Sequence, residues 1–405
     1  MVASCGATVV PSPTGRTTAP AASTSLEPAD PSASIVLDGT ISWQLVADPQ
    51  GLWTTAAFEN LRGAVPFGGG MLVYGHGDAG GDAGTQEAVI WQTSDLQTWT
   101  ARSFDKAIGT EQNASIKEIA GNDRGLVAIG DLCCPDKRAF WYSLDGVSWS
   151  EWTIGGAAGD PKFTQLHGVA AARPGFVIVG EEQGSAAVWF SADGTTWART
   201  DDLGPGTIRD VAPFATGFIA VGRLQDEPGA EADWDAAVWV SEDGLSWTRF
   251  GATAKALMDG DAELGWVVPF DGGVWVLGHV GEHRDRLACP VKDECLWGSE
   301  ATWVGTLELD AWQGPSHDAP RTISGQSVIA SRGGLLTNDG DALGPMLTSE
   351  DGLAWERWPA SQPFPEGGIT ALAALTDSTV VAVGNVHNEG ATMRDGAIWI
   401  GTYAR

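Results

Sequence analysis

The chain has few basic residues and no long apolar run. Lysine and arginine together number 23 against 52 aspartates and glutamates, which gives a formal net charge of -29 over 405 residues. Phosphate contacts need lysine and arginine, so this balance disfavours binding of DNA, RNA or an anionic membrane surface through a general basic field. No apolar run approaches the roughly 18 residues of a membrane-spanning helix. A hydrophobic share of 43 % nevertheless provides a large core and argues against wholesale disorder.

The N-terminal stretch 1–36 differs in composition from the rest of the chain. Residues 11–34 consist mainly of proline, serine, threonine and alanine, which is typical of a flexible tether. The tripeptide Val-Ala-Ser directly before Cys5 resembles the lipobox of bacterial lipoproteins. That resemblance implies a lipid on Cys5 and a protein that is extracellular or anchored at the cell surface, with no other attachment to the membrane. A chance match of so short a motif is the alternative.

Four cysteines remain once Cys5 is assigned to a lipid. Cys289 and Cys295 bracket a short loop with a proline, and a disulfide between them would suit an oxidising compartment. Cys133 and Cys134 are adjacent, so their Cα atoms lie about 3.8 Å apart, below the usual disulfide range, and a bridge there would be a strained ring. Four free thiols are the alternative. Neither spacing is the C-x2-C typical of zinc sites, and we assign no metal.

One phrase recurs along the chain after residue 36. It reads Ala-Val-Trp-x-Ser-x-Asp-Gly-x-Ser/Thr-Trp, with clear copies at 139–149, 187–197 and 237–247 and weaker ones at 89–99, 301–312 and 346–355. A segment of the form Gly-apolar-Val/Ile-x-Val/Ile-Gly precedes each phrase, and a short apolar segment precedes that one. Each unit therefore predicts four short strands, A to D. The Asp-Gly pair is expected between C and D, because it readily adopts the positive φ of a hairpin tip.

The number of units predicts a closed ring. Six units end in a tryptophan: Trp99, Trp149, Trp197, Trp247, Trp312 and Trp355. A seventh has a strand C at 397–401 but no strand D after it, and residues 41–47 resemble the missing strand. We predict an all-β fold over residues 37–405: a seven-bladed β-propeller of four-stranded antiparallel blades, closed by an N-terminal strand that completes the last blade. An open β-solenoid would leave the split unit unexplained.

The phrase Ser-x-Asp-Gly-x-x-Trp resembles the Asp-box, or BNR repeat, of the sialidase-like β-propeller superfamily. In that family the box is a structural turn on the blade periphery, which implies the same role for Asp145, Asp193, Asp243 and Asp351. Sialidases of the family also carry an Arg-Ile-Pro motif and a tyrosine nucleophile. No such motif occurs here, and only three tyrosines are present, none in a nucleophile's position. The resemblance therefore indicates a non-catalytic bacterial lipoprotein of this fold.

Candidate binding residues lie between strands B and C. In a propeller, the B–C and D–A connections share one face, and here the B–C segments are long and dissimilar, as is usual where binding resides. They carry the candidate ligand-binding residues His76, Asp131, Trp234, His279, His283, Arg286, His387 and Arg394. Exposed loops of an acidic protein also collect polar residues without any ligand. The His-x3-His spacing at 279–283 occurs in metal sites, but on a glycine-rich segment it is weak evidence.

Taken together, these patterns predict a monomeric, exported propeller that binds a cell-envelope protein or glycan on its B–C and D–A face, without catalysis and without a cofactor. A divergent glycoside hydrolase or lyase is the alternative, and it would need two inward carboxylates about 5–10 Å apart. A pure scaffold is a third possibility. Fold analogy alone does not choose between them.

Overall fold

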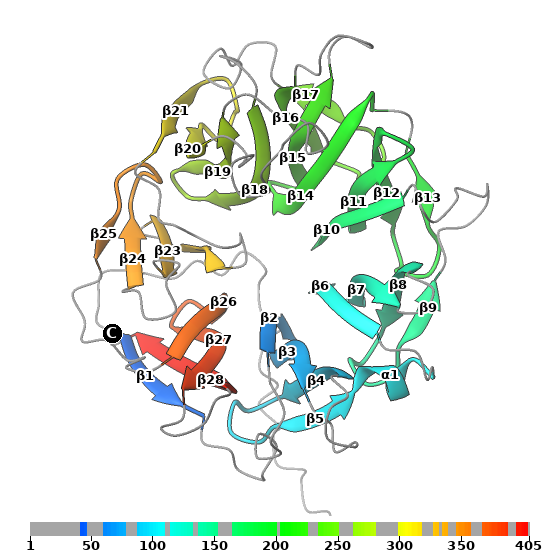
Figure 1. Cartoon of the computed structure of the whole chain (residues 1–405), viewed down its shortest axis with the longest axis vertical. Helices are drawn as coiled ribbons and strands as arrows, with labels where there is room; N and C mark the ends of the chain where they lie inside the picture. The colour runs from blue at the N-terminus through cyan, green and yellow to red at the C-terminus, as the bar shows by residue number, and fades with distance from the viewer. Residues whose placement is uncertain are drawn as a thin grey trace, which may run out of the picture.

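The computed structural model describes residues 41–46, 60–77, 87–109, 114–132, 137–152, 164–200, 203–225, 234–250, 262–280, 299–317, 327–331, 334–338, 346–357, 367–387 and 394–403. Within these ranges, seven antiparallel sheets of four strands each follow one another along the chain. Figure 1 shows them arranged in a ring around a common centre. The predicted all-β, seven-bladed β-propeller is therefore confirmed.

The first four blades run from the innermost strand outwards in chain order. Blade 1 consists of β2 (Asn60–Phe67), β3 (Gly70–Gly77), β4 (Glu87–Thr93) and β5 (Thr100–Ser103). Blade 2 consists of β6 (Ala114–Asn122), β7 (Gly125–Leu132), β8 (Lys137–Ser143) and β9 (Ser150–Trp152). Blade 3 consists of β10 (Thr164–Ala172), β11 (Gly175–Glu182), β12 (Ser185–Ser191) and β13 (Ala198–Arg199). Blade 4 consists of β14 (Gly206–Phe214), β15 (Gly217–Gln225), β16 (Trp234–Ser241) and β17 (Thr248–Phe250).

The remaining three blades complete the ring. Blade 5 consists of β18 (Ala262–Phe270), β19 (Gly273–Val280), β20 (Ser299–Gly305) and β21 (Trp312–Ser316). Blade 6 consists of β22 (Ile329–Ser331), β23 (Gly334–Asn338), β24 (Met346–Ser349) and β25 (Glu356–Arg357). Blade 7 consists of β26 (Gly367–Thr376), β27 (Thr379–His387), β28 (Arg394–Tyr403) and β1 (Ile41–Leu45). Its outermost strand thus comes from the other end of the sequence.

Strand β1 closes the ring as the split repeat predicts. It pairs antiparallel with β28, and Trp43 lies opposite Gly401. A Cβ added to Gly401 would come within 2.9 Å of the indole of Trp43, so the glycine leaves the space that this ring occupies. Ile41 is buried in an apolar cluster with Trp399 and Tyr403. The closing strand therefore contributes apolar contacts as well as backbone hydrogen bonds.

The core of the protein is divided among the interfaces between blades. Seven apolar clusters occur in the described residues, and each joins two neighbouring blades around the ring. Aromatic side chains strengthen these contacts: Trp197 of blade 3 meets Phe140 of blade 2 edge to face, with ring centroids 4.9 Å apart. Because every blade has a neighbour on each side, the middle strands are apolar on both faces, as Val177, Ile178 and Val179 of β11 illustrate.

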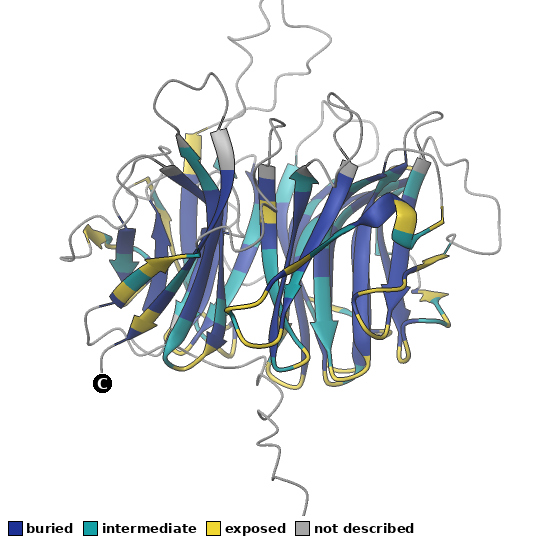
Figure 2. Ribbon diagram, turned by 90° about the horizontal axis from the view of Figure 1, so that it is seen from below, coloured by how far each residue is buried: buried dark blue, intermediate teal, exposed yellow. Residues whose placement is uncertain are grey.

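The two ends of the ring differ. One end, here called the turn end, holds the A–B and C–D turns, and Figure 2 shows exposed residues concentrated in these short turns. In a C–D turn, Asp145 Oδ1 accepts the backbone N–H groups of Val147 and Ser148 at 2.8 and 2.9 Å. The indole of Trp149 donates to Gly146 O at 3.3 Å. The hydrogen bonds from the N–H groups of Ser148 and Val147, that of Ser148 first, hold the pKa of Asp145 below its usual value.

The same C–D turn forms where the glycine is missing. At 93–98, Leu96 occupies the glycine position with a φ of 59°, and Asp95 Oδ1 still accepts the N–H groups of Gln97 and Thr98. The turn therefore depends on the aspartate more than on the glycine. The other end of the ring, where the B–C and D–A connections lie, is called the loop-rich end below.

One short helix interrupts the strands of the described residues. Helix α1 (Phe104–Ala107) follows β5 and is capped by Ser103, whose side chain accepts the N–H of Lys106. Phe104 packs edge to face on Trp141 of blade 2, with centroids 5.0 Å apart. In the part of the chain that the structure describes, no helix has the length and apolar character needed to cross a membrane.

Ring closure by β1 predicts unequal effects of two truncations. Deleting residues 1–48 removes β1, exposes the edge of β28 and strips the apolar contacts of Ile41 and Trp43. Deleting residues 1–34 leaves β1 in place. We expect a clearly lower melting temperature for the first truncation and a melting temperature close to the parent's for the second. Equal melting temperatures would show that β1 does not stabilise the ring.

Candidate functional site

The innermost strands line a central cavity of about 1610 Å³. Each of them is the inner edge of its blade, so on the channel side it has no neighbouring strand to pair with. Backbone groups on such an edge need other partners. Several of these partners are side chains of the preceding blade, and they lie near the loop-rich end.

A β-bulge recurs at the same place in six of the innermost strands. In each, the pairing with the second strand skips one residue that directly follows a leucine or isoleucine: Arg62, Lys117, His167, Arg209, Gly265 and Thr370. A bulge leaves the extra residue unpaired and re-aims its side chain. All of these residues except Gly265 line the cavity. We call the four consecutive members from blades 1 to 4, which are Arg62, Lys117, His167 and Arg209, the basic crescent.

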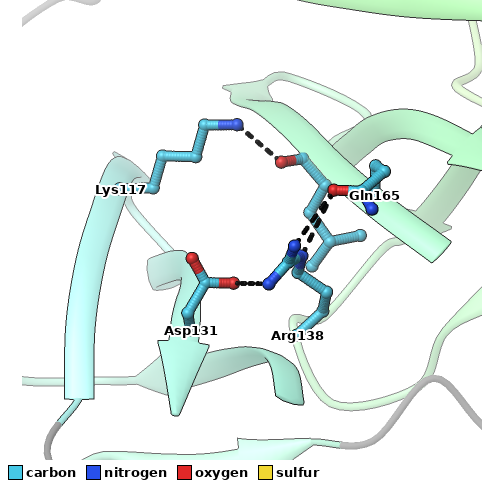
Figure 3. A network of polar contacts seen from close by, with 5 residues as sticks. Lys117, Asp131, Arg138 and Gln165 are labelled. Atoms are coloured by element: carbon cyan, nitrogen blue, oxygen red, sulfur yellow. Dashed lines mark hydrogen bonds and ion pairs between the residues drawn. The ribbon is translucent and has the colours of Figure 1, made fainter. Parts of the chain in front are cut away.

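Blades 2 and 3 are joined by polar contacts at this end of the channel (Figure 3). Lys117 Nζ donates to Leu166 O at 2.7 Å, which satisfies a backbone carbonyl beside the bulge of β10. Arg138 forms an ion pair with Asp131, with Nη1 and Oδ1 2.7 Å apart. The same guanidinium donates through Nε and Nη2 to Gln165 Oε1 at 3.3 and 3.2 Å. Partners on blades 2 and 3 therefore fix the orientation of the Arg138 guanidinium.

A second network connects blades 3, 4 and 5. Glu263, which is 9 % exposed, pairs with Arg209 and also with Arg223, whose Nη1 lies 3.0 Å from Glu263 Oε2. The guanidinium of Arg223 stacks on Trp234, 4.2 Å from the ring centroid. Arg209 Nη1 lies 3.4 Å from His167 Nε2. Two arginines thus share one carboxylate.

Two carboxyl groups lie deeper, beside β10. Glu118 Oε2 accepts the N–H of Val169 at 3.1 Å, across the interface between blades 2 and 3. Asp210 accepts the N–H groups of Val211 and Val267 at 2.8 and 2.9 Å, the latter across the interface between blades 4 and 5. Burial raises the pKa of Asp210. Burial, followed by the nearby Asp210, raises the pKa of Glu118 from 4.5 to about 8.

His167 of the basic crescent and the nearby His76 carry no charge at neutral pH. Burial, then the cations Arg209 and Lys117, lowers the pKa of His167 to about 3. Burial and then Arg62 lower the pKa of His76 to about 4. If Arg209 donates to His167 Nε2, the remaining N–H of that imidazole is at Nδ1 and is free to donate. The crescent therefore offers N–H donors and the cationic groups of Arg62, Lys117 and Arg209; burial lowers the pKa of Lys117.

Six of the predicted ligand-binding residues lie at strand ends on the loop-rich end: His76, Asp131, Trp234, His279, His387 and Arg394. The expectation that these six residues lie in loops between strands B and C is wrong, because all of them are paired within strands. Trp234 begins β16 opposite Gln225, and His387 pairs with Arg394. The B–C hairpins extend past the apolar residues because backbone pairing does not require apolar side chains.

The other predicted residues lie outside the described part of the chain: His283, Arg286, Cys5, Cys133, Cys134, Cys289 and Cys295. Among the described residues, no three histidine, cysteine, aspartate or glutamate side chains gather in a way that could hold a metal ion. Asp131 and Trp234 are brought into the charged networks.

Most other members of the charged networks were not predicted from the sequence: Lys117, Glu118, Arg138, Arg209, Asp210, Arg223 and Glu263. A signal for Lys117, Glu118, Arg209 and Asp210 was present, because a leucine or isoleucine precedes the bulge in six of the seven blades, as in Ile-Lys-Glu and Ile-Arg-Asp.

The raised pKa of Glu118 predicts a pH-dependent stability. Since the folded state binds this proton more tightly than the unfolded state, stability falls as pH rises from about 4.5 to about 8. Glu118→Gln keeps an oxygen for the Val169 N–H and cannot ionise. We expect melting temperatures of variant and parent to be similar near about pH 5, and that of the variant to be higher near about pH 8.5.

Glu118→Ala is the control for this measurement. It leaves the Val169 N–H without an acceptor, so it should lower stability by about 1–3 kcal/mol at both pH values. Parallel pH profiles for the parent and Glu118→Gln would show that Glu118 does not hold the proton.

Comparisons with known proteins identify the fold and no family. No protein-family model matches the chain, and no curated protein matches it. Among solved structures, YCF48 bound to D1 peptide is 12 % identical, with a TM-score of 0.53 over 92 % of this chain and 98 % of that one. The β-propeller domain of the trilobed protease from Pyrococcus furiosus is 10 % identical, with a TM-score of 0.48 over 84 % and 95 %.

The polysaccharide lyase Uly1 is 8 % identical, with a TM-score of 0.47 over 82 % of this chain and 88 % of that one. At such identities the likeness shows the fold alone, and the resemblance to the Asp-box superfamily stays a prediction. By fold, the chain is a seven-bladed β-propeller.

Proposed function

We propose that this chain is a non-catalytic binding propeller, exported and anchored through a lipid on Cys5, which holds a protein partner on its loop-rich end. The observation that carries the proposal is the convergence of charged side chains from blades 1 to 5 on that end of the channel. Arg138, Arg209 and Arg223 are each held by partners on a neighbouring strand or blade. Guanidinium groups fixed in this way lose little freedom when a ligand binds.

The opposite end offers less to a partner. The carboxylates of its C–D turns are engaged by their own backbone, as Asp193 is by the N–H groups of Thr195 and Thr196 at 2.8 and 2.7 Å. The turns are also alike from blade to blade, whereas recognition requires distinct groups. YCF48, of similar fold, is seen with a peptide, which supports a protein partner over a glycan.

A glycoside hydrolase or lyase is the second candidate, because Glu118 and Asp210 place two carboxyl groups of raised pKa beside the channel. An acid–base pair must be able to reach a substrate. Here, however, Glu118 Oε2 and both oxygens of Asp210 accept backbone N–H groups, which favours a structural role. Hydrolytic or eliminative turnover of an envelope glycan that is abolished in Glu118→Gln would establish the enzyme and overturn the binding proposal.

Photo-cross-linking in the intact source cell tests which end holds the partner. A photoreactive amino acid is placed at Gln183, exposed in the short turn between β11 and β12 on the loop-rich end. In a matched variant it replaces Leu245, which is 46 % exposed in a C–D turn. We expect one protein to be cross-linked from position 183 and not from position 245. Cross-linking of the partner from position 245 alone would place the binding surface on the turn end and contradict the proposal.

A further inference from the structure

The two sides of the central channel differ in the residues that stand at the bulges of the innermost strands. Blades 1 to 4 carry Arg62, Lys117, His167 and Arg209 at the bulge, whereas blades 5 and 7 carry Gly265 and Thr370. Thr370 donates to Leu61 O at 2.6 Å and so serves the edge of the next blade. One side of the channel is therefore lined with cations and N–H donors, whereas the described bulge residues on the other side, Gly265 and Thr370, are uncharged.

The cations of the basic crescent are incompletely neutralised. No salt bridge joins Arg62 or Lys117 to an acidic side chain of the described residues, and both side chains are exposed to the channel. Arg209 shares Glu263 with Arg223. Burial raises the pKa of Glu118, the carboxyl next to Lys117, to about 8, so that it is largely protonated at neutral pH. Burial raises the pKa of Asp210 only to about 6, so this carboxylate offsets one of the three cations of the crescent. A protein of net charge -29 thus keeps a positive region inside its channel.

We propose that the basic crescent binds the carboxylates of an acidic peptide segment that enters the channel from the loop-rich end. The inference rests on the proposed function, because it names the part of the protein partner that is recognised. The bulges hold the four donors on four separate blades, so one segment can meet several of them in succession. Each charge-assisted contact between a guanidinium or ammonium group and a carboxylate is strong and directional.

The geometry favours a peptide over other anions. A long nucleic acid would be repelled by the acidic exterior. An extended peptide also offers backbone groups to the free edges of the innermost strands that line the cavity.

Gly265 allows the crescent to be extended. A Cβ at this position would meet only Leu277 O, at 3.6 Å, which is an ordinary contact. Gly265→Arg therefore adds a fifth cationic side chain at the bulge of blade 5 with little disturbance. Arg62→Gln removes a cation that makes no salt bridge in the described structure. Arg173→Gln is the matched control, because Arg173 is exposed and lines the cavity at the turn end.

The test measures binding of fluorescein-labelled hexaglutamate to the full chain by fluorescence anisotropy at low salt, with hexaglutamine and hexalysine as controls. We expect hexaglutamate alone to bind, and its affinity to fall with added salt. Arg62→Gln should weaken binding about 5- to 10-fold, and Gly265→Arg should strengthen it by about the same factor. Arg173→Gln should leave it within about twofold of the parent.

Three results would overturn the inference. Hexaglutamate could fail to bind, its affinity could be insensitive to both Arg62→Gln and Gly265→Arg, or an oligogalacturonate or inorganic phosphate could displace it at equal concentration. The last result would assign the crescent to an anionic glycan or to small anions in general. If hexaglutamate fails while a partner is still cross-linked from position 183, the ligand class is wrong and the proposed function stands. Cross-linking from position 245 alone contradicts the proposed function itself.

Discussion

The innermost strands of the seven sheets face a common channel, and on that side their backbone groups have no neighbouring strand to pair with. The need for other partners decides which side chains lie near the channel. Apolar packing holds the blades together, but it cannot satisfy an unpaired carbonyl or N–H. The chain meets this need with side chains from the preceding blade: Lys117 on Leu166 O, Glu118 on Val169 N–H, Asp210 on Val267 N–H and Thr370 on Leu61 O. Polar groups that stabilise the ring are thereby gathered where a ligand could enter.

The same arrangement explains how a strongly acidic protein keeps a cationic region. The bulges turn one residue per strand towards the channel, and in four consecutive blades that residue is arginine, lysine or histidine. Two arginines share the carboxylate of Glu263, and burial raises the pKa of Glu118. The acidic exterior then disfavours non-specific anions, whereas the channel favours a segment that can reach several donors at once.

The fold could be predicted from the sequence because its unit repeats. The recurring Asp-Gly turn and tryptophan give the number of blades, and the split unit gives the closure by β1. For the candidate site, only its location at one end of the ring could be predicted. Trp234 and Arg394 were expected in loops because polar residues interrupt the apolar pattern there, yet the hairpins stay paired. Lys117 and Arg209 were overlooked because period-two alternation does not locate a bulge.

A crystal structure of the full chain with hexaglutamate tests the central claim most directly, because it shows where the peptide lies relative to the bulges. The account predicts peptide density in the channel at the loop-rich end, against β2, β6, β10 and β14, with carboxylates within hydrogen-bonding distance of Arg62 and Lys117. Density on the turn end or on the outer faces of the blades would contradict it.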